Sequence, residues 1–548
     1  MAITTSNGAV KFLVADVTLN NGTTTTITTG GGAVEFGTDL VAVDVETNGG
    51  DNDSLVIASG AGDVSFFGTV GVANSLGGLD VNAATAGTGD ITFKGNIGTS
   101  AGGGNPGVNG TTSIGTATGA ATDTENVHFL GSLYSFDGGV TTIAADADVS
   151  GTTDNIEVGT AGTNVEFKAA GEALTFVGGS LDLVNNANLT INSGGGDVTV
   201  TGITAVSDET VTIEAGAGSV TLGAIGDTGH TQIHELDIDG GGGIILTGNI
   251  YTSGLATGAD AAAKGAHVNF GDPVTITGSV TIDTDDSSAT DLPGDVTFTT
   301  SIDGTDSSTD SLTIESGSGT ITLAAIGATK ELEGLTINAQ TTGTSAITVP
   351  NIGSGAINLS TGAGVNGNVA IGNANTASIT LSGLIYSVDG NITLTTTAGS
   401  GTSTSNHEIN ITGGTAGADP FIATDAGNIS FVGGEVELAD NSNLTINSNR
   451  LAGSTSGNIS IAKGIDGTSD EDLTITTTTS GTGTISLGPV GQGTFTTAAD
   501  GVSEINTFTV TGAGAITLNG DIQTSDAADN DISITLSLIH ISEPTRRE

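Results

Sequence analysis

Apolar and polar residues alternate along most of the chain in a five-residue unit. Each unit reads Gly, a small or polar residue, Val or Ile, a polar residue and a large apolar residue, as in GAVEF at Gly32–Phe36. The two apolar side chains stand two positions apart and share one face of a strand. The glycine before the strand is expected to supply a turn with positive φ. Copies of the unit begin at Gly8, Gly32, Gly62, Gly89, Gly196, Gly218, Gly294, Gly319, Gly390, Gly427, Gly457, Gly483 and Gly514.

A second type of short strand alternates with the first and sets the period. It reads Leu or Val, a polar residue, and Ile or Val, and its copies at Leu55 and Leu79 lie 24 positions apart. A period of roughly 22–26 residues with two or three short strands is typical of a solenoid, whose turns bury their apolar faces by stacking. We therefore predict an all-β fold, a right-handed parallel β-helix or a closely related β-solenoid.

A row of antiparallel β-sandwich domains is the competing architecture. Such domains usually show punctuation at about 100 residues and a Trp or Tyr landmark. The chain has no Trp, three Tyr and no linker-like change of composition. Because these landmarks are missing, we prefer the solenoid and keep tandem β-sandwiches as the alternative.

A much longer repeat lies over the short one. FVGGSLDLVNNANLTINS at Phe176–Ser193 recurs as FVGGEVELADNSNLTINS at Phe431–Ser448, with the apolar residues kept and the changes mostly at polar sites such as Ser180 and Glu435. We predict internal copies near 131–253 and 384–525, within one continuous repeat region at 1–536. A solenoid explains this pattern, because its inward residues are constrained and its outward residues are free.

Composition excludes several classes of protein. Strong helix signals are absent, and regular Val, Ile, Leu and Phe alternation at 36% hydrophobic content argues against disorder. The 60 acidic and 9 basic residues give a net charge of −51, which excludes a basic footprint for nucleic acid and argues against docking on anionic lipid. The absence of Cys excludes a disulfide framework. The chain has no run of 18 apolar residues, so the sequence predicts no membrane-spanning helix.

The two ends of the chain differ from an ordinary exported protein. The start lacks a basic segment followed by an apolar one, so we expect either export by a C-terminal signal or an internal piece of a longer protein. The end, SLIHISEPTRRE, breaks the Gly/Thr/Asn pattern and holds two of the three arginines. We interpret 537–548 as a discordant, non-native tail, although a capping segment is the alternative.

The GDVTF, GTITL and LTINA strands, the Gly/Thr/Asn richness and the long internal copies resemble bacterial surface adhesins with β-strand repeats. These adhesins are related to filamentous-haemagglutinin-like and autotransporter passenger regions. The resemblance covers roughly residues 1–536 and implies an extracellular or surface-attached right-handed β-helix that acts in adhesion or biofilm. It implies as partners a host or environmental surface, a polysaccharide or matrix component, or further copies of the chain.

Acidic loops provide the only cofactor candidate, which is calcium. Calcium prefers six to eight oxygen ligands, and closely spaced carboxylates in loops supply several. The nonapeptide repeat of calcium-binding β-rolls is approached by GGDNDSLVI but is not matched. Solvated turn acids are the favoured interpretation of these loops, and calcium binding is the alternative. The candidate ligands are Asp51, Asp53, Asp283, Asp285 and Asp286.

Catalytic patterns are weak, and we expect no enzyme activity. His230 and His234 stand four apart but lie between predicted strands, where this spacing does not form a metal site. A carbohydrate-active β-helix enzyme, the runner-up function, needs a carboxylate cluster with a basic residue, and Arg450 is the only arginine outside the tail. Aromatic platforms for sugars are scarce.

Threonine-rich runs at 21–30, 393–405 and 473–484 raise one further possibility. Threonine stacked on a flat solenoid face is a feature of ice-binding proteins, but the spacing within these runs is irregular. Strand propensity on an outward face is the favoured explanation for these runs. The predicted function is therefore a structural and adhesive stalk of a large exported surface protein, with a self-assembling surface-layer or sheath subunit as another alternative.

Overall fold

The computed structural model contains strands and no helix among the residues that it describes. It divides into two compact units: unit 1 comprises Met1–Pro273 with Asp286–Leu292, and unit 2 comprises Val274–Asp285 with Pro293–Glu548. The described residues are 1–20, 22–49, 52–82, 89–99, 107–116, 126–145, 155–206, 209–228, 233–252, 266–285, 294–305, 309–338, 346–354, 364–398, 408–413, 419–451, 456–468, 471–477, 482–491, 505–512, 514–524 and 531–536.

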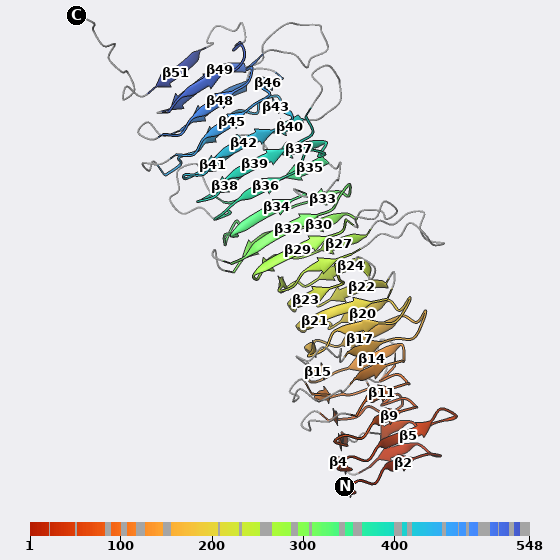
Figure 1. Ribbon diagram of the computed structural model, residues 1–548. Helices are drawn as coiled ribbons and strands as arrows, with labels where there is room; N and C mark the ends of the chain where they lie inside the picture. The colour runs from red at the N-terminus through yellow and green to blue at the C-terminus, as the bar shows by residue number, and fades with distance from the viewer. Residues whose placement is uncertain are drawn as a thin grey trace, which may run out of the picture. The chain divides into compact units, whose positions relative to one another are not determined.

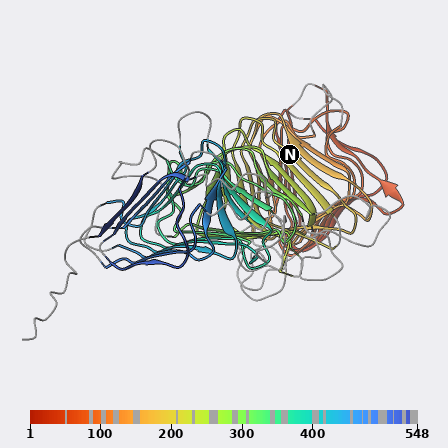
Figure 2. The ribbon, with the colours of Figure 1, turned by 90° about the horizontal axis from the view of Figure 1, so that it is seen from above.

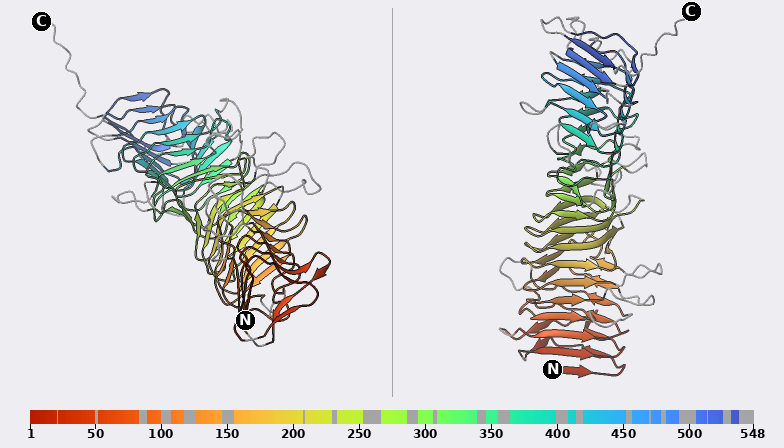
Figure 3. Two further views of the ribbon diagram at one scale, coloured as in Figure 1. Left: turned by 60° about the horizontal axis from the view of Figure 1, so that its bottom comes forward. Right: turned by 90° about the vertical axis from the view of Figure 1, so that its left-hand side faces the viewer.

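Unit 1 stacks short strands in three series, each paired in parallel with the next turn (Figures 1 and 3). The first series is β2 (Val10–Phe12), β5 (Val34–Thr38), β9 (Val64–Phe66), β11 (Ile91–Phe93), β13 (Val127–Phe129), β16 (Ile156–Val158), β19 (Leu181–Leu183) and β21 (Val198–Ala205). The second is β1 (Ala2–Thr4), β4 (Thr24–Thr28), β8 (Ser54–Ala58), β10 (Gly78–Val81), β12 (Thr112–Ile114), β15 (Thr141–Ala144), β18 (Leu174–Val177), β21 again, β23 (Val220–Ile225) and β25 (Ile244–Leu246). The third is β14 (Leu133–Phe136), β17 (Val165–Ala169), β20 (Leu189–Asn192), β22 (Glu209–Glu214), β24 (Ile233–Asp239) and β27 (His267–Phe270). Four shorter strands complete the unit: β3 (Val17–Leu19), β6 (Val41–Ala42), β7 (Val45–Thr47) and β26 (Ile250–Tyr251).

Unit 2 is built in the same way (Figure 1). β28 (Val274–Ile276) pairs with β31 (Ile302–Gly304). One series is β29 (Ser279–Asp283), β32 (Ser311–Glu315), β34 (Gly334–Ile337), β36 (Val369–Ile371), β39 (Ile392–Thr395), β42 (Ile429–Val432), β45 (Ile459–Ile461), β48 (Ile485–Leu487) and β50 (Ile516–Leu518). Another is β30 (Val296–Phe298), β33 (Ile321–Thr322), β35 (Ala346–Val349), β37 (Ser378–Leu381), β40 (Glu408–Ile411), β43 (Glu435–Leu438) and β46 (Ile465–Gly467). The third is β38 (Leu384–Ser387), β41 (Phe421–Thr424), β44 (Leu444–Asn447), β47 (Glu471–Thr476), β49 (Ile505–Gly512) and β51 (Ile532–Leu536).

Parallel pairing confirms the solenoid-like part of the predicted fold. In unit 1, Val198 pairs with Val220, a strand only 22 positions later, and in unit 2 Ile392 pairs with Ile429, which is 37 positions later. Compact turns therefore match the expected period, and other turns are longer. Antiparallel sandwiches would require antiparallel neighbours, and among the described strands only the short β5–β6 pair is of that kind. Figure 2 shows successive turns of unit 1 lying behind one another.

Inward residues stack on their own kind from turn to turn. The last residue of the five-residue unit forms a column of rings in unit 1, in which Phe36, Phe66 and Phe93 are separated by 4.8 Å between centroids and lie almost parallel. These rings are fully buried. The ring spacing equals the usual distance between neighbouring strands, so each ring packs on the one below without leaving its rotamer.

The glycines of the five-residue unit are explained by stacking, and the expected positive φ is wrong. The described copies, such as Gly62 and Gly427, lie outside the set of glycines with positive φ. A Cβ on Gly62 would instead meet the backbone of Gly32 one turn earlier, and a Cβ on Gly427 would meet the carbonyl of Gly390. Glycine is required because the backbones of adjacent turns approach too closely for any side chain.

The second residue of the unit links turns through its side chain. The Oδ1 atom of Asp63 accepts a hydrogen bond from the backbone N–H of Asp90 (3.1 Å), and Asp90 accepts one from Asn126 (3.2 Å). Unit 2 has the same ladder, in which Asn391 accepts from Asn428 and Asn428 accepts from Asn458. A short Asp or Asn is favoured here because it satisfies a backbone N–H at the turn before each strand.

Matching turns in the two units share unusual backbone devices. Asn82 in unit 1 and Asn338 in unit 2 both have positive φ, at 55° and 45°. Both accept a hydrogen bond from the backbone N–H of a buried serine one turn earlier, Ser59 and Ser316 respectively. The two units therefore share this turn.

Candidate functional site

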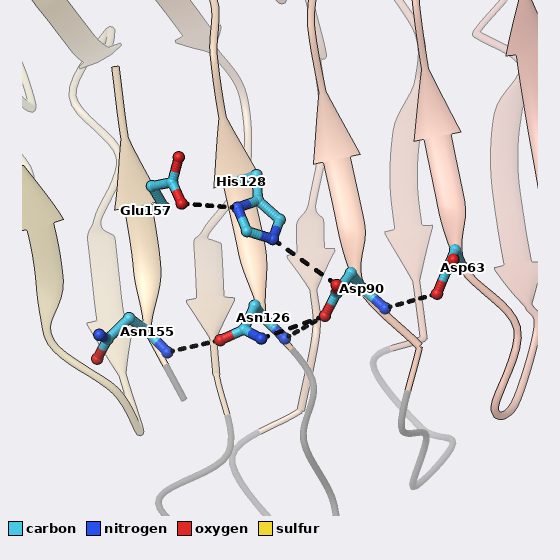
Figure 4. Close-up of polar contacts among 6 residues, drawn as sticks. All are labelled: Asp63, Asp90, Asn126, His128, Asn155 and Glu157. Carbon is cyan, nitrogen blue, oxygen red and sulfur yellow. Dashed lines mark hydrogen bonds and ion pairs between the residues drawn. The ribbon is translucent and has the colours of Figure 1, made fainter. Parts of the chain in front are cut away.

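A polar column on the outer side of the first series in unit 1 contains His128 between two carboxylates (Figure 4). His128 projects from β13, and its Nδ1 atom lies 3.2 Å from Oε2 of Glu157 on β16. Its Nε2 atom lies 3.9 Å from Oδ2 of Asp90, which precedes β11. The imidazole is about a quarter exposed. Protonated His128 would pair with both carboxylates, which come from the two adjacent turns.

The same column continues to Asp182 on β19, which pairs with Glu157. Burial raises the pKa of the Asp182 carboxyl above its usual value, and the charge of Glu157 adds to this effect. Hydrogen bonds from Thr204 and Asn155 oppose it. The hydrogen bonds from Thr204 and Asn155 join Asp182 to adjacent turns, whereas the aligned carboxylates of Glu157 and Asp182 repel each other.

Of the candidate calcium ligands in the first acidic loop, Asp53 lies within the described residues. Asp53 is fully buried, and its Oδ1 atom accepts a hydrogen bond from the backbone N–H of Thr23 at 2.8 Å. This carboxylate therefore holds two turns together. Asp51 lies outside the described residues.

In the second acidic loop, Asp283 and Asp285 lie within the described residues. Asp283 ends β29, and its Oδ1 atom accepts the backbone N–H of Asp285 at 3.0 Å, a local turn. Asp286 lies outside the described residues. Across the described ranges, no three His, Asp or Glu side chains are grouped so that they could hold a metal ion.

The structure brings together three residues that the sequence pattern did not connect. In unit 2 the hydroxyl of Tyr386 donates a hydrogen bond to Oδ2 of Asp425 at 2.8 Å. The guanidinium carbon of Arg450 lies 3.7 Å from the centroid of the Tyr386 ring. Burial raises the pKa of Asp425, and the positive charge of Arg450 partly offsets this shift. The signal in the sequence was the isolated arginine, but its partners lie 25 and 64 positions earlier.

This trio is better suited to packing than to catalysis. Tyr386 is 2% exposed and packs with Phe421 and Ala423 in an apolar cluster on the outer side of β38 and β41. Burial also raises the pKa of the Tyr386 hydroxyl, which opposes its use as a base at neutral pH. His234 lies in β24, whereas His230 is outside the described residues.

The outer side of the third series in unit 1 is acidic. Glu214, Asp237 and Asp239 occupy aligned positions on β22 and β24, and all three are exposed. A hydrogen bond with Asp272 is the main cause of a raised pKa at Asp239, with burial and the charges of Asp272, Asp237 and Glu214 adding to it. This face concentrates negative charge and is suited to repelling anionic surfaces.

Two columns of uncharged polar residues lie on the outer side of the third series in unit 2, and Asp472 on β47 lies at their edge. Thr445, Thr474, Thr509 and Ser533 form one aligned column across β44, β47, β49 and β51, and Asn447, Thr476, Thr511 and Thr535 form the next. We call these eight residues the hydroxyl face. All are partly or fully exposed. The face can offer hydroxyl and methyl groups in a regular array.

Comparisons with models of protein families, with curated proteins and with solved structures found no match for this chain. The search of the described ranges for a helix long and apolar enough to cross a membrane found none. Assignment of a function therefore rests on the fold and on these faces.

Proposed function

We propose that the chain is a structural and adhesive segment of a large exported bacterial surface protein and that it performs no catalysis. The observation that carries the proposal is the repetition of the same stacking devices in both units. Gly62 and Gly427 each lie against a glycine of the preceding turn, and Asx ladders accompany them. Such devices extend a fold turn by turn without building a pocket.

The distribution of variable residues supports the same proposal. Between the copies, inward Leu189 and Ile191 correspond to Leu444 and Ile446, all of them buried. The outward positions differ instead: β24 of unit 1 carries carboxylates where the matching strand β49 of unit 2 carries threonine hydroxyls. A scaffold that keeps its core and changes its outer faces presents surfaces to partners, as binding solenoids do.

The acidic surface suits a location outside the cell, at the bacterial surface. A net charge of −51 makes neighbouring chains repel each other and keeps them soluble. Adhesion would then depend on an uncharged or cation-bridged contact. The partners we propose are a host or environmental surface, a polysaccharide or matrix component, or further copies of the chain.

A bead assay tests this proposal. Beads coated with the full chain should attach saturably to cells or to a matrix polymer, and soluble chain should compete. Release of new reducing ends from acidic polysaccharides would instead identify an enzyme. Calcium-dependent sheets or filaments in negative-stain micrographs, without attachment, would identify an assembly subunit.

A further inference from the structure

The hydroxyl face of unit 2 differs from its counterpart in unit 1 in chemistry but not in backbone. In both units a register irregularity precedes the face, between Glu209 and Thr210 and between Glu471 and Asp472. Both glutamates are fully buried and accept the N–H of an asparagine with positive φ, Asn186 or Asn441. The two faces can therefore be compared position by position.

At the matched positions the carboxylates of unit 1 are replaced. Asp237 and Asp239 in β24 correspond to Thr509 and Thr511 in β49, and Glu214 corresponds to Thr476. The inward residues between them stay apolar, with Ile238 and Val510 both fully buried. In a chain with 60 acidic residues, eight aligned outward positions without a charge form a distinct surface.

Register makes this surface a two-dimensional array. The hydroxyl-bearing residues repeat across strands that lie about 4.7–4.9 Å apart, and alternate residues along one strand lie about 6.6–6.8 Å apart. Six of the eight positions are Thr. A β-branched side chain has restricted χ1 rotation, so its hydroxyl and methyl groups are held in place before a ligand arrives.

We propose that the hydroxyl face binds the surface of ice. Each threonine offers one O–H donor, acceptor lone pairs and a methyl group, which together can engage a lattice of water molecules. A crystal of water rejects ions, and the eight positions of the hydroxyl face carry no charge, although Asp472 lies at the edge of the face on β47. A sugar polymer would favour an aromatic platform, and the nearest rings on this outer side, Tyr386 and Phe421, are covered.

The irregular spacing of threonine along the sequence does not oppose this inference. Residues 473–484 look like an uneven run, but Thr474 and Thr476 take their partners from β49, 35 positions later. Regularity arises from the pairing of turns. The inference goes beyond the proposed function, since ice binding needs neither export nor attachment to cells.

Partition into slowly growing ice tests the proposal with the full chain. Labelled chain should be enriched in the ice at least several-fold over a labelled inert protein, and Thr509→Lys or Thr474→Lys should abolish the enrichment. Thr212→Lys, at the position in β22 that matches Thr474, provides the matched control and should partition as the unsubstituted chain does. Circular dichroism before freezing checks that each variant is folded. If the lysine variant unfolds, Thr509→Val, which keeps the shape of the threonine side chain but removes its hydroxyl, takes its place.

Three results would overturn the inference. The unsubstituted chain could be excluded from ice like the inert protein. Thr509→Lys and Thr474→Lys could be enriched as strongly as the unsubstituted chain. Retention on an insoluble neutral polysaccharide that is lost in Thr509→Lys, without enrichment in ice, would assign the face to a glycan. Failure of the bead assay alongside enrichment in ice would remove only the proposed adhesion.

Discussion

Oδ1 of Asn338 accepts a hydrogen bond of 2.7 Å from the backbone N–H of Ser316, which lies one turn earlier in unit 2. Both residues are almost fully buried. The asparagine therefore combines a backbone with positive φ and a side chain that satisfies a buried donor. Asn82 and Ser59 repeat the relationship in unit 1.

Asn338→Ala should lower the free energy of unfolding by about 2–3 kcal/mol, because it leaves the Ser316 N–H unsatisfied and keeps a strained φ. Asn338→Gly relieves the φ and should lose less. Urea unfolding of the three proteins measures the difference. Equal stability of the alanine variant and the parent would contradict this account of the turn.

Gly427→Ala should destabilise unit 2 by at least about 3 kcal/mol, because the new Cβ meets the carbonyl of Gly390. Gly278→Ala is the control, since Gly278 has positive φ but no atom within 4 Å of an added Cβ. That variant should cost only about 1 kcal/mol. Thermal unfolding compares them, and a larger loss at Gly278 would show that φ rather than stacking explains the glycine column.

Glu435 should give unit 2 a pH-dependent stability. Burial, with the nearby charge of Asp466, raises the pKa of Glu435 from 4.5 to about 7. Because the folded pKa is the higher one, the cost of the ionised form is complete above pH 7 and disappears as the pH falls toward 4.5. Glu435→Ser introduces the residue found at the matching position of unit 1, Ser180.

At pH 8 the Glu435→Ser variant should be more stable by about 1 kcal/mol after allowance for solvent screening of this half-exposed group. The gain should shrink to near zero by pH 4.5. Chemical unfolding at several pH values measures it. A gain that is constant with pH would mean that Glu435 is costly for its size and not for its charge.

Arg450→Met should destabilise unit 2 by about 1–2 kcal/mol at neutral pH, since it removes the cation above Tyr386 and the positive charge that favours ionised Asp425. The pKa of Asp425 is already raised in the folded state, and the loss should lessen once acid protonates that carboxyl. Lys330→Met, which removes an exposed cation elsewhere in unit 2, serves as the control. Equal effects of the two variants would argue against a specific contact at Tyr386.

The sequence predicted the strands and the inward residues well because both follow from local alternation. Phe36 and Phe66 could be aligned from the five-residue unit alone, and their rings do stack. The reason for the glycines could not be read in the same way. A turn with positive φ and a close approach between turns both demand glycine, and only the pairing of turns separates the two.

Which side of a strand a residue faces was harder to predict. Tyr134 and Tyr386 occur in matching Tyr-Ser-x-Asp-Gly segments, but Tyr134 pairs with the core residue Ile97, whereas Ile385 rather than Tyr386 pairs with Ile352. Tyr134 therefore stacks inside unit 1 against Phe167, and Tyr386 lies on the outer side of unit 2. A shift of one residue reverses the face of every side chain, and the spacing of the turn that sets it is not visible in the motif.

The candidate sites depended on the same long-range pairing. Asp283 and Asp285, which are close in sequence, are joined by a local turn hydrogen bond. Arg450 and Asp425, which are distant in sequence, come together beside Tyr386. The sequence identified candidate residue types, and register decides which of them meet.

In-register parallel stacking is the central claim, and engineered disulfides test it most directly because the chain has no Cys. Thr393 and Ser430 are paired on β39 and β42, and neighbouring strands lie within the distance that a disulfide spans. The double variant Thr393→Cys/Ser430→Cys should oxidise to an internal disulfide without loss of fold. The control Thr393→Cys/Ile429→Cys places its second cysteine on the opposite side of β42 and should stay reduced. Cross-linking of the control as readily as the paired variant, or of neither, would contradict the account.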